Sequence, residues 1–222
     1  MKDLTFFSWG RYPNNPQSAD MIYWQDEIAK ILNNKREDFS TLAYGKGRSY
    51  GDSCLASSNR ILNMENLNSF MNLDFHNGLL KVESGITLLE ILKIIIPKGW
   101  FLPVTPGTKY VTVGGAIAND VHGKNHHRRG TFGSHVQKMG IFRSDKGYIV
   151  LSPENNKELF EATIGGLGLT GIIAWAEIKL IKINSSRISF FSKRFETLDD
   201  FIRLSNEFDK NYEYSVAWID CL

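Results

Sequence analysis

Cysteine is scarce in this chain, and its scarcity excludes several classes of protein. Cys54 and Cys221 are the two cysteines among 222 residues, and they stand far apart. They form no CxxC pair and no spacing typical of a zinc site, so neither a disulfide-stapled scaffold nor a cysteine-bound metal is indicated. A reducing compartment suits this usage best, although the two thiols leave room for a single disulfide.

Long apolar runs are missing as well. The most apolar stretch, residues 88–96, contains Glu90 and Lys93 and stops at Pro97, so it is too short to cross a bilayer. The first residues show no apolar run with a small-residue cleavage site, and we expect no signal peptide. The sequence therefore predicts no transmembrane segment, and a protein that is cytoplasmic or peripherally associated with a membrane.

A large excess of charge of either sign is also absent. The formal net charge is +2 with histidines neutral, which gives no general attraction to nucleic acid. The small basic cluster of Lys124, Arg128 and Arg129 is typical of a solvated or phosphate-facing loop. We therefore expect no nucleic-acid partner.

What the chain does contain is clustered glycine. Residues 106–135 hold six glycines and four of the five histidines. Gly114 and Gly115 let the backbone approach a ligand closely, and a glycine-rich turn that leads into a short helix presents free N–H groups to an anion. Titratable and cationic groups follow at once, among them His122 and Lys124. The alternative is a tight structural turn with a solvated basic edge.

Two further glycine-rich loops lie at 45–51 and 165–171. Residues 166–171 spell GxGxxG, but they precede a strand pattern and not a helix, so the dinucleotide-binding fingerprint fails on context. No loop has the GxxxxGK[ST] form of a phosphate loop. Three glycine loops that converge on one groove would suit an extended ligand with a central pyrophosphate, bound by backbone amides.

The predicted elements mix strand pairs with helices, without regular βαβ alternation. This order favours an α+β fold with two sub-sheets around a shared ligand groove. Thr87 can cap a helix that ends at Pro97, and Trp24 is expected in the core on the first helix. Two hairpins are expected, at 70–75 with 79–83 and at 136–144 with 148–152. The remaining predictions are helices at 18–32, 153–163 and 197–210, and strands at 39–44, 60–64, 172–183, 188–195 and 212–219.

Five segments together resemble the FAD-dependent oxidases of the vanillyl-alcohol-oxidase type, and within that family its decaprenylphosphoryl-ribose oxidase branch. They are GKGRSYGD at 45–52, PGTKYVTVGGAIANDVHGKNHH at 106–127, FGSHV at 132–136, GGLGLTGII at 165–173 and YSVAWID at 214–220. The resemblance implies a PCMH-type FAD-binding domain at 1–184, built of two α+β sub-domains that meet near residues 104–110 with FAD between them. It also implies that residues 185–222 are the first elements of a truncated substrate domain.

The resemblance also implies roles for single residues. The loop 43–53 would wrap the FAD pyrophosphate, residues 119–122 would run beside the flavin, and Ile173 would contact the adenine half through its backbone. Three residues, Tyr50, His122 and Lys124, would face the substrate and serve catalysis. The full set of implied cofactor contacts is Ala43, Gly45, Lys46, Gly47, Arg48, Ser49, Tyr50, Gly51, Ser53, Gly107, Thr112, Val113, Gly114, Gly115, Asn119, Asp120, Val121, His122 and Ile173.

The implied reaction is the oxidation of a sugar hydroxyl to a ketone by hydride transfer to the flavin. The implied substrate is a polyprenyl-phosphate-linked pentose, with a short-chain reductase as the partner that completes an epimerisation. Many members of the family hold FAD covalently through a histidine in the first glycine loop. Arg48 occupies that position here, so we expect non-covalent FAD.

Three other interpretations stay open at this point. One is the FAD domain of a sugar-lactone or polyol oxidase, and another is a non-catalytic flavin-binding fragment. The third is a metal site at His122, His126, His127 and His135. Gly123 and Gly130 argue against it, because they disfavour a helix that would align these histidines.

Overall fold

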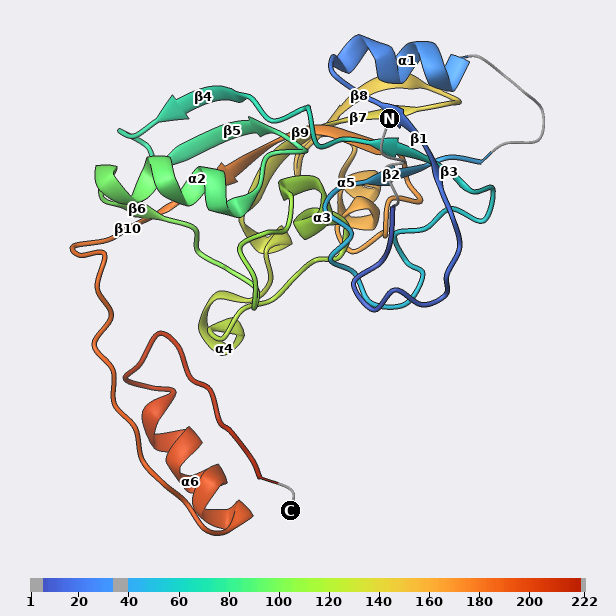
Figure 1. Ribbon diagram of the computed structural model, residues 1–222. Coiled ribbons are helices and arrows are strands. Elements are labelled where there is room, and N and C mark those ends of the chain that lie inside the picture. The colour runs from blue at the N-terminus through green and yellow to red at the C-terminus, as the bar shows by residue number, and fades with distance from the viewer. Residues whose placement is uncertain (1–5, 34–39, 221–222) are drawn as a thin grey trace.

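An antiparallel sheet of five strands is the centre of the fold. In the computed structural model, which describes residues 6–33 and 40–220, its strand order is β4–β5–β9–β7–β8 (Figure 1). The two outer pairs, β4 with β5 and β7 with β8, are the hairpins that the sequence predicts. The strands run over Phe70–Asp74 (β4), Leu79–Glu83 (β5), Val136–Arg143 (β7), Gly147–Leu151 (β8) and Ile172–Lys179 (β9).

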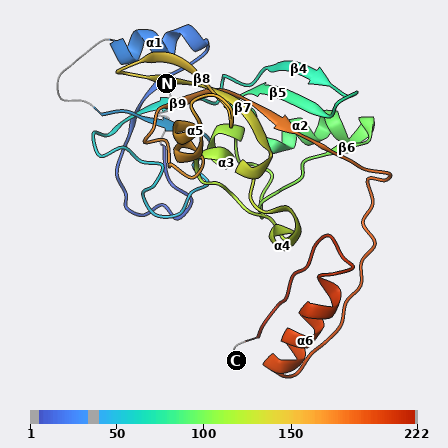
Figure 2. The ribbon, with the colours of Figure 1, turned by 180° about the vertical axis from the view of Figure 1, so that it is seen from behind.

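Helices cover both faces of this sheet. On one face lies α1 (Gln25–Asn33), whose Ile28 packs with Phe142 and Trp175. The other face carries α2, α3 and α5, which share the largest apolar cluster with β5, β7 and β9. Figure 2 shows the same layers from behind. The three helices span Leu88–Ile95 (α2), Val113–Ala118 (α3) and Lys157–Thr163 (α5).

The central strand β9 is buried on both faces, whereas the sequence pattern indicates a half-buried strand. Gly140 pairs with Trp175 and Ile141 pairs with Ile173, so Ala174 is an extra residue that forms a β-bulge. The bulge reverses the alternation of side chains. Ala174 therefore joins the cluster under α1, although the sequence pattern places it on the same face as Ala176.

Two smaller sheets complete the body of the protein. A parallel three-stranded sheet, β1–β3–β2, is complete by residue 63, and the pair β10–β6 is antiparallel. The five-stranded sheet takes strands from both sides of residues 104–110, where the sequence analysis places the meeting of two sub-domains. The small strands are Ser18–Met21 (β1), Leu42–Tyr44 (β2), Arg60–Asn63 (β3), Trp100–Phe101 (β6) and Ile181–Lys182 (β10).

The first helix begins later than predicted. Residues 18–21 form β1, which pairs with β3, and α1 starts only at Gln25. The Glu27 carboxylate accepts hydrogen bonds from the backbone N–H groups of Tyr23 and Trp24, at 2.8 and 3.0 Å, and so caps the helix there. Trp24 is part of this cap, directly before the first helical residue, and is 70% exposed, so the expectation that it belongs to the core is wrong.

The predicted helix after Thr87 is confirmed in detail. Thr87 and Glu90 form a capping box, in which the threonine hydroxyl accepts from the Glu90 N–H and the Glu90 carboxylate accepts from the Thr87 N–H. Pro97 follows in a 3₁₀ turn, Ile96–Lys98 (η1), that ends at the left-handed Gly99. The start of α3 meets the end of β5 directly, because the Gly114 N–H donates to the Ser84 carbonyl at 2.8 Å.

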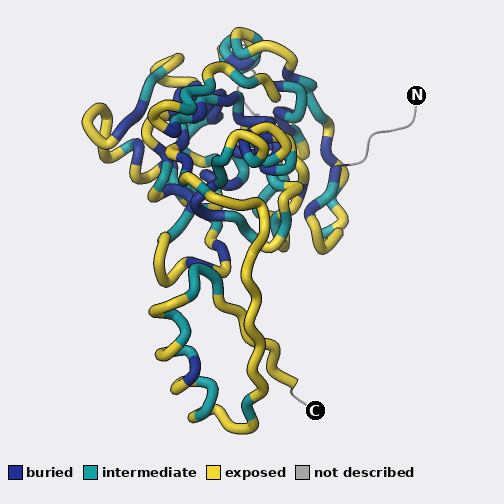
Figure 3. Tube along the Cα trace, turned by 90° about the vertical axis from the view of Figure 1, so that its left-hand side faces the viewer, coloured by how far each residue is buried: buried dark blue, intermediate teal, exposed yellow. Residues whose placement is uncertain are grey.

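Residues 184–220 leave the body as an extension (Figure 1). The predicted helix is present as α6 (Leu198–Phe208), and Thr197 caps it. The strands predicted at 188–195 and 212–219 are wrong, because neither segment has a strand partner in the described ranges. Figure 3 shows that most of this extension is exposed, in contrast to the buried centre of the body. No helix in the described ranges is long and apolar enough to span a bilayer.

Candidate functional site

A cavity of about 660 Å³ opens between the small parallel sheet and α3, which covers one face of the large sheet. All three glycine-rich loops contribute to its wall, as the sequence predicts. The predicted cofactor contacts found in its lining are Ala43, Gly45, Lys46, Gly47, Arg48, Ser49, Tyr50, Ser53, Gly107, Thr112, Gly114, Gly115, Asn119, Val121, His122 and Ile173.

Helix α3 holds the three loops together. At its N-terminal end, Gly45 lies against Thr112, so closely that a Cβ at Gly45 would be 2.4 Å from Thr112 Oγ1. At its C-terminal end, the carbonyl oxygens of Ile117 and Ala118 accept hydrogen bonds from the third loop, from the N–H groups of Gly165 (3.0 Å) and Leu167 (2.8 Å). The first loop therefore needs glycine where it touches α3, and the third loop is tied to the helix by backbone hydrogen bonds.

The first loop supplies the free backbone donors. Among the described residues, no protein acceptor receives the N–H groups of Lys46, Gly47 and Arg48. Gly47 has φ +59° and lies against the Phe7 carbonyl and the Tyr44 hydroxyl, where a side chain has no room. A run of unpaired N–H groups in such a turn is a concave anion site.

An N-terminal arm holds this loop in place. The Tyr44 hydroxyl donates to the carbonyl oxygen of Phe7 at 2.7 Å, and the Trp9 N–H donates to the carbonyl oxygen of Ser49 at 2.9 Å. The Arg48 guanidinium lies 5.0 Å from the centre of the Trp9 ring, within cation–π range. Trp9 itself lines the cavity.

The start of α3 does not present free donors, which corrects an expectation from the sequence. The N–H of Val113 donates to the Ile86 carbonyl at 2.9 Å, and that of Gly114 donates to the Ser84 carbonyl at 2.8 Å. The N–H of Gly115 donates to Thr112 Oγ1 at 3.2 Å. Because all three donors are used inside the protein, free backbone donors for an anion are offered by the first loop and not by this helix.

Ser84 is a lining residue that sequence reasoning missed. It is 2% exposed, and its hydroxyl has no hydrogen-bond partner among the described residues. Its backbone is fully used, because its N–H donates to the Ala174 carbonyl at 2.9 Å and its carbonyl accepts from Gly114. A buried hydroxyl without a partner is costly, so a polar ligand group in this cavity would satisfy it. Nothing in the sequence around the end of β5 marks this serine.

Two of the three predicted catalytic residues border the cavity. Tyr50 and His122 line the cavity and are exposed, whereas Lys124 is exposed but lies outside the lining. The His122 ring lies edge-to-face on the His126 ring, with 5.8 Å between their centres. His126 belongs to a one-turn helix, His126–Arg129 (α4), which forms although the sequence analysis expects no helix between Gly123 and Gly130.

Three predicted cofactor contacts are also outside the lining: Gly51, Val113 and Asp120. Val113 is fully buried in the apolar cluster that α3 shares with the large sheet, and it does not border the cavity. The Asp120 carboxylate turns inward and accepts from the Gly133 N–H at 2.9 Å. Gly51 lies between Tyr50 and Ser53, which both border the cavity, but does not border it itself.

Burial changes two titratable groups at the cavity wall. It raises the pKa of Tyr44 to about 12, and the nearby Cys54 adds to this shift. Burial also raises the pKa of the Cys54 thiol above its usual value. Both side chains are therefore neutral near pH 7. Tyr44 lies within the loop 43–53 that the sequence assigns to the pyrophosphate, but neither residue is among the single contacts expected there.

Two of the remaining histidines of the 106–135 stretch, His126 and His135, contact their own loop, whereas His127 Nε2 lies 3.9 Å from a carboxylate oxygen of Asp209 in the extension. His126 Nδ1 lies 3.3 Å from the Gly123 carbonyl, and His135 Nε2 lies 2.9 Å from the Arg129 carbonyl. Within the described ranges, no group of three His, Cys, Asp or Glu residues could hold a metal ion.

Comparisons with known proteins agree with this geometry. The sequence model of a family described as FAD binding domain matches residues 24–152. Decaprenylphosphoryl-beta-D-ribose oxidase of Mycolicibacterium smegmatis is 36% identical over 220 residues, which are 96% of this chain and 47% of that protein. D-arabinono-1,4-lactone oxidase of Kluyveromyces lactis is 27% identical over 206 residues, covering 88% of this chain and 38% of that protein.

A solved structure shows the same fold. An alkyldihydroxyacetonephosphate synthase superposes with a TM-score of 0.66 at 19% identity, over 76% of this chain and 32% of that one. The chain spans less than half the length of each of these curated relatives.

Proposed function

Because this chain belongs to the FAD binding domain family, with FAD as its cofactor and a PCMH-type fold, we propose that it is the FAD-binding part of an oxidoreductase that oxidises a sugar hydroxyl to a ketone. One observation carries the proposal. His122 and Tyr50 border the same cavity as the free N–H groups of the loop 46–48. The cavity volume of about 660 Å³ lies within the range of ligand pockets.

The chain's own residues fit FAD. The unpaired N–H groups of Lys46, Gly47 and Arg48 suit the pyrophosphate, because backbone amides bind such an anion without requiring many formal charges. The unpartnered Ser84 hydroxyl suits a polar atom of the cofactor. Arg48 stacks on Trp9, which supports non-covalent binding at the position where relatives of the family use a histidine.

FAD and the chain's own residues would supply different parts of the reaction. Bound FAD supplies the acceptor for the hydride that leaves the carbinol carbon. The His122 imidazole, at the cavity and open to solvent, is the group we assign to take the hydroxyl proton. The Tyr50 phenol, 78% exposed at the same cavity, is assigned to orient the sugar. Lys124 lies outside the cavity lining, and we assign to it the fixed positive charge near the substrate.

For the substrate, we propose a polyprenyl-phosphate-linked pentose, because a relative with 36% identity is named a decaprenylphosphoryl-ribose oxidase. As the partner, we propose a short-chain reductase that completes an epimerisation. The second candidate is a sugar lactone, because an arabinonolactone oxidase is also similar over most of the chain. The two reactions place the same demands on the FAD cavity and differ in the group that the substrate carries.

An anaerobic titration tests the proposal. The purified chain is loaded with FAD, and the flavin band is followed while a polyprenyl-phosphate pentose or D-arabinono-1,4-lactone is added. Bleaching by the lipid-linked pentose alone supports the first candidate, and bleaching by the lactone alone supports the second. Tight FAD binding with no bleaching by either compound would show that this chain by itself is a flavin-binding module without turnover. His122→Gln should abolish the bleaching that the substrate causes in the wild-type chain.

A further inference from the structure

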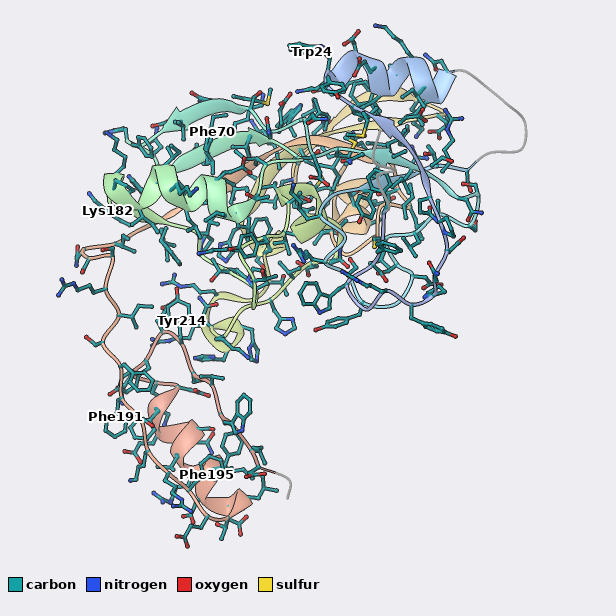
Figure 4. All side chains as sticks on the ribbon, viewed as in Figure 1. Trp24, Phe70, Lys182, Phe191, Phe195 and Tyr214 are labelled. Atoms are coloured by element: carbon teal, nitrogen blue, oxygen red, sulfur yellow. The ribbon has the colours of Figure 1, made fainter. Side chains whose placement is uncertain are left out.

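The extension after β10 returns to the body at α4. Residues 209–215 lie against α4, and Figure 4 shows the labelled Tyr214 between α4 and α6. The Ser215 N–H donates to the carbonyl oxygen of Lys124 at 3.0 Å, and Arg128 Nη2 donates to the carbonyl oxygen of Lys210 at 2.9 Å. The contact joins segments more than 80 residues apart in the chain.

A carboxylate is at the centre of this contact. Glu213 accepts hydrogen bonds through both of its oxygens from Arg129, with Nε–Oε1 at 2.8 Å and Nη2–Oε2 at 3.2 Å. It also accepts from Asn125 Nδ2 at 3.1 Å. Burial acts to raise the pKa of Glu213, but the hydrogen bonds from Arg129 and Asn125 outweigh burial and hold its pKa below the usual value. The carboxylate is therefore charged in this contact.

Asn125 ties the contact to the body. It is fully buried, and its amide group donates one hydrogen bond to Glu213 and the other to the carbonyl oxygen of Pro103, at 2.8 Å. The neighbouring Gly123 lies so close to the Thr105 carbonyl that a Cβ would be 2.6 Å from it. Asn125 thus bridges the extension and the strand-like segment that leads into the second glycine loop.

Apolar packing does not hold α4. None of its four residues is buried. Its position must come from polar contacts, and the strongest of these are the bidentate pair with Glu213 and the bridge through Asn125. His122 rests on the ring of His126 in this helix, so the orientation of α4 sets the orientation of His122 at the cavity.

We propose that Glu213 is a positioning residue for the candidate active site: by holding Asn125 and Arg129 it fixes α4, and through His126 it fixes the ring of His122. This inference deepens the proposed function, on which the catalytic meaning of His122 rests. The ion pair is partly exposed, with 39% of the Arg129 side chain and 29% of the Glu213 side chain accessible. Its contribution to global stability is therefore small, and its effect is on geometry.

Histidine-selective NMR of the full chain tests the inference without cofactor or turnover. The chain labelled with ¹⁵N-histidine has five imidazole rings, each with two ring-nitrogen signals, and His122→Gln assigns the pair that belongs to His122. Glu213→Ala should shift and broaden the ring signals of His122 and His126, and should leave that of His76, which lies exposed in the β4–β5 turn, unchanged. Amide exchange of residues 122–130 should rise about tenfold, as expected for a lost charge-assisted hydrogen bond.

The controls separate positioning from general stability. Arg129→Gln, which removes the other partner, should give the same His122 shift, and the double variant should add nothing further. Arg203→Gln breaks a pair with Asp200 inside α6, at 3.1 Å, and should leave His122 unchanged. An unmoved His122 signal in folded Glu213→Ala would overturn the inference, as would faster exchange throughout the chain. Failure of the proposed function would appear separately, as flavin that no substrate bleaches.

Discussion

Gly45 and Thr112 meet where the first glycine loop touches the start of α3, and a Cβ at Gly45 would lie 2.4 Å from Thr112 Oγ1. The same hydroxyl accepts the N–H of Gly115 at 3.2 Å and caps the helix. The contact explains why glycine is needed at position 45, since a side chain there would displace the cap. It also joins two of the three loops into one cavity wall.

This contact predicts a non-additive pair of substitutions. Gly45→Ala should force the Thr112 side chain to rotate and should lower the free energy of unfolding by about 1 kcal/mol, the typical value of an N-cap. Thr112→Ala should cost a similar amount, and Gly45→Ala should then cost almost nothing more. Urea unfolding of the single and double variants measures this. Gly10→Ala, where a Cβ meets nothing within 4 Å, is the control, and strictly additive costs would contradict the prediction.

Tyr44 predicts a loss of stability at alkaline pH. Burial raises its pKa in the folded protein to about 12, from an ordinary value of 10.0. A raised pKa means that the stabilising contribution is complete below pH 10 and is lost as the pH rises from about 10 to 12, by about 2.7 kcal/mol for two units. Tyr44→Phe should remove this part of the pH dependence. Parallel pH–stability curves for wild type and Tyr44→Phe between pH 9 and 12 would show that the assignment is wrong.

Ser84 and Ser8 form a matched pair for testing the cofactor site. Both are buried serines whose hydroxyls have no partner among the described residues, but only Ser84 lines the cavity. Ser84→Ala should weaken FAD binding about threefold to tenfold, the effect of one lost hydrogen bond of about 0.5–1.5 kcal/mol. Ser8→Ala should leave the affinity unchanged. Calorimetric titration of apoprotein with FAD measures both, and equal affinities for the two variants would refute the role of Ser84.

Cys54 is a reporter for the same cavity. Its pKa is raised by burial, so little thiolate is present at pH 7 and alkylation should be slower than that of a free cysteine. Because Cys54 lines the cavity, saturating FAD should slow the reaction further. Mass spectrometry of maleimide-treated Cys221→Ser protein, with and without FAD, gives the two rates. An unchanged rate in the presence of bound FAD would show that the cofactor lies elsewhere.

Non-covalent binding predicts how the flavin behaves on denaturation. Acid precipitation should release all yellow cofactor into the supernatant, because Arg48 cannot form the bond that a histidine makes in covalent relatives. The supernatant absorbance, compared with the protein concentration, measures the released fraction. Flavin that stays with the precipitate would disprove the prediction. His122, which lines the cavity, would then be the first residue to test as the point of attachment.

Local signals in the sequence were sufficient for much of the architecture. The capping box of Thr87 and Glu90, the stop at Pro97 and Gly99, and the two hairpins depend on residues close together in the chain, so they could be predicted. The strands predicted in 188–195 and 212–219 failed for the opposite reason. An apolar extended segment becomes a strand only when a second strand pairs with it, and local sequence does not record whether one is present.

By itself the sequence determined which residues could form a flavin site, since the three glycine loops and His122 are visible in it. Only the tertiary structure decided which groups are available. Gly114 and Gly115 look like anion donors in the sequence, but carbonyls and a hydroxyl packed beside them use their N–H groups, and the free donors are at 46–48. In the same way, Ser84 and Glu213 acquire roles only from distant neighbours. A hydrogen bond is satisfied by whatever lies within about 3 Å, and that depends on packing between segments far apart in the chain.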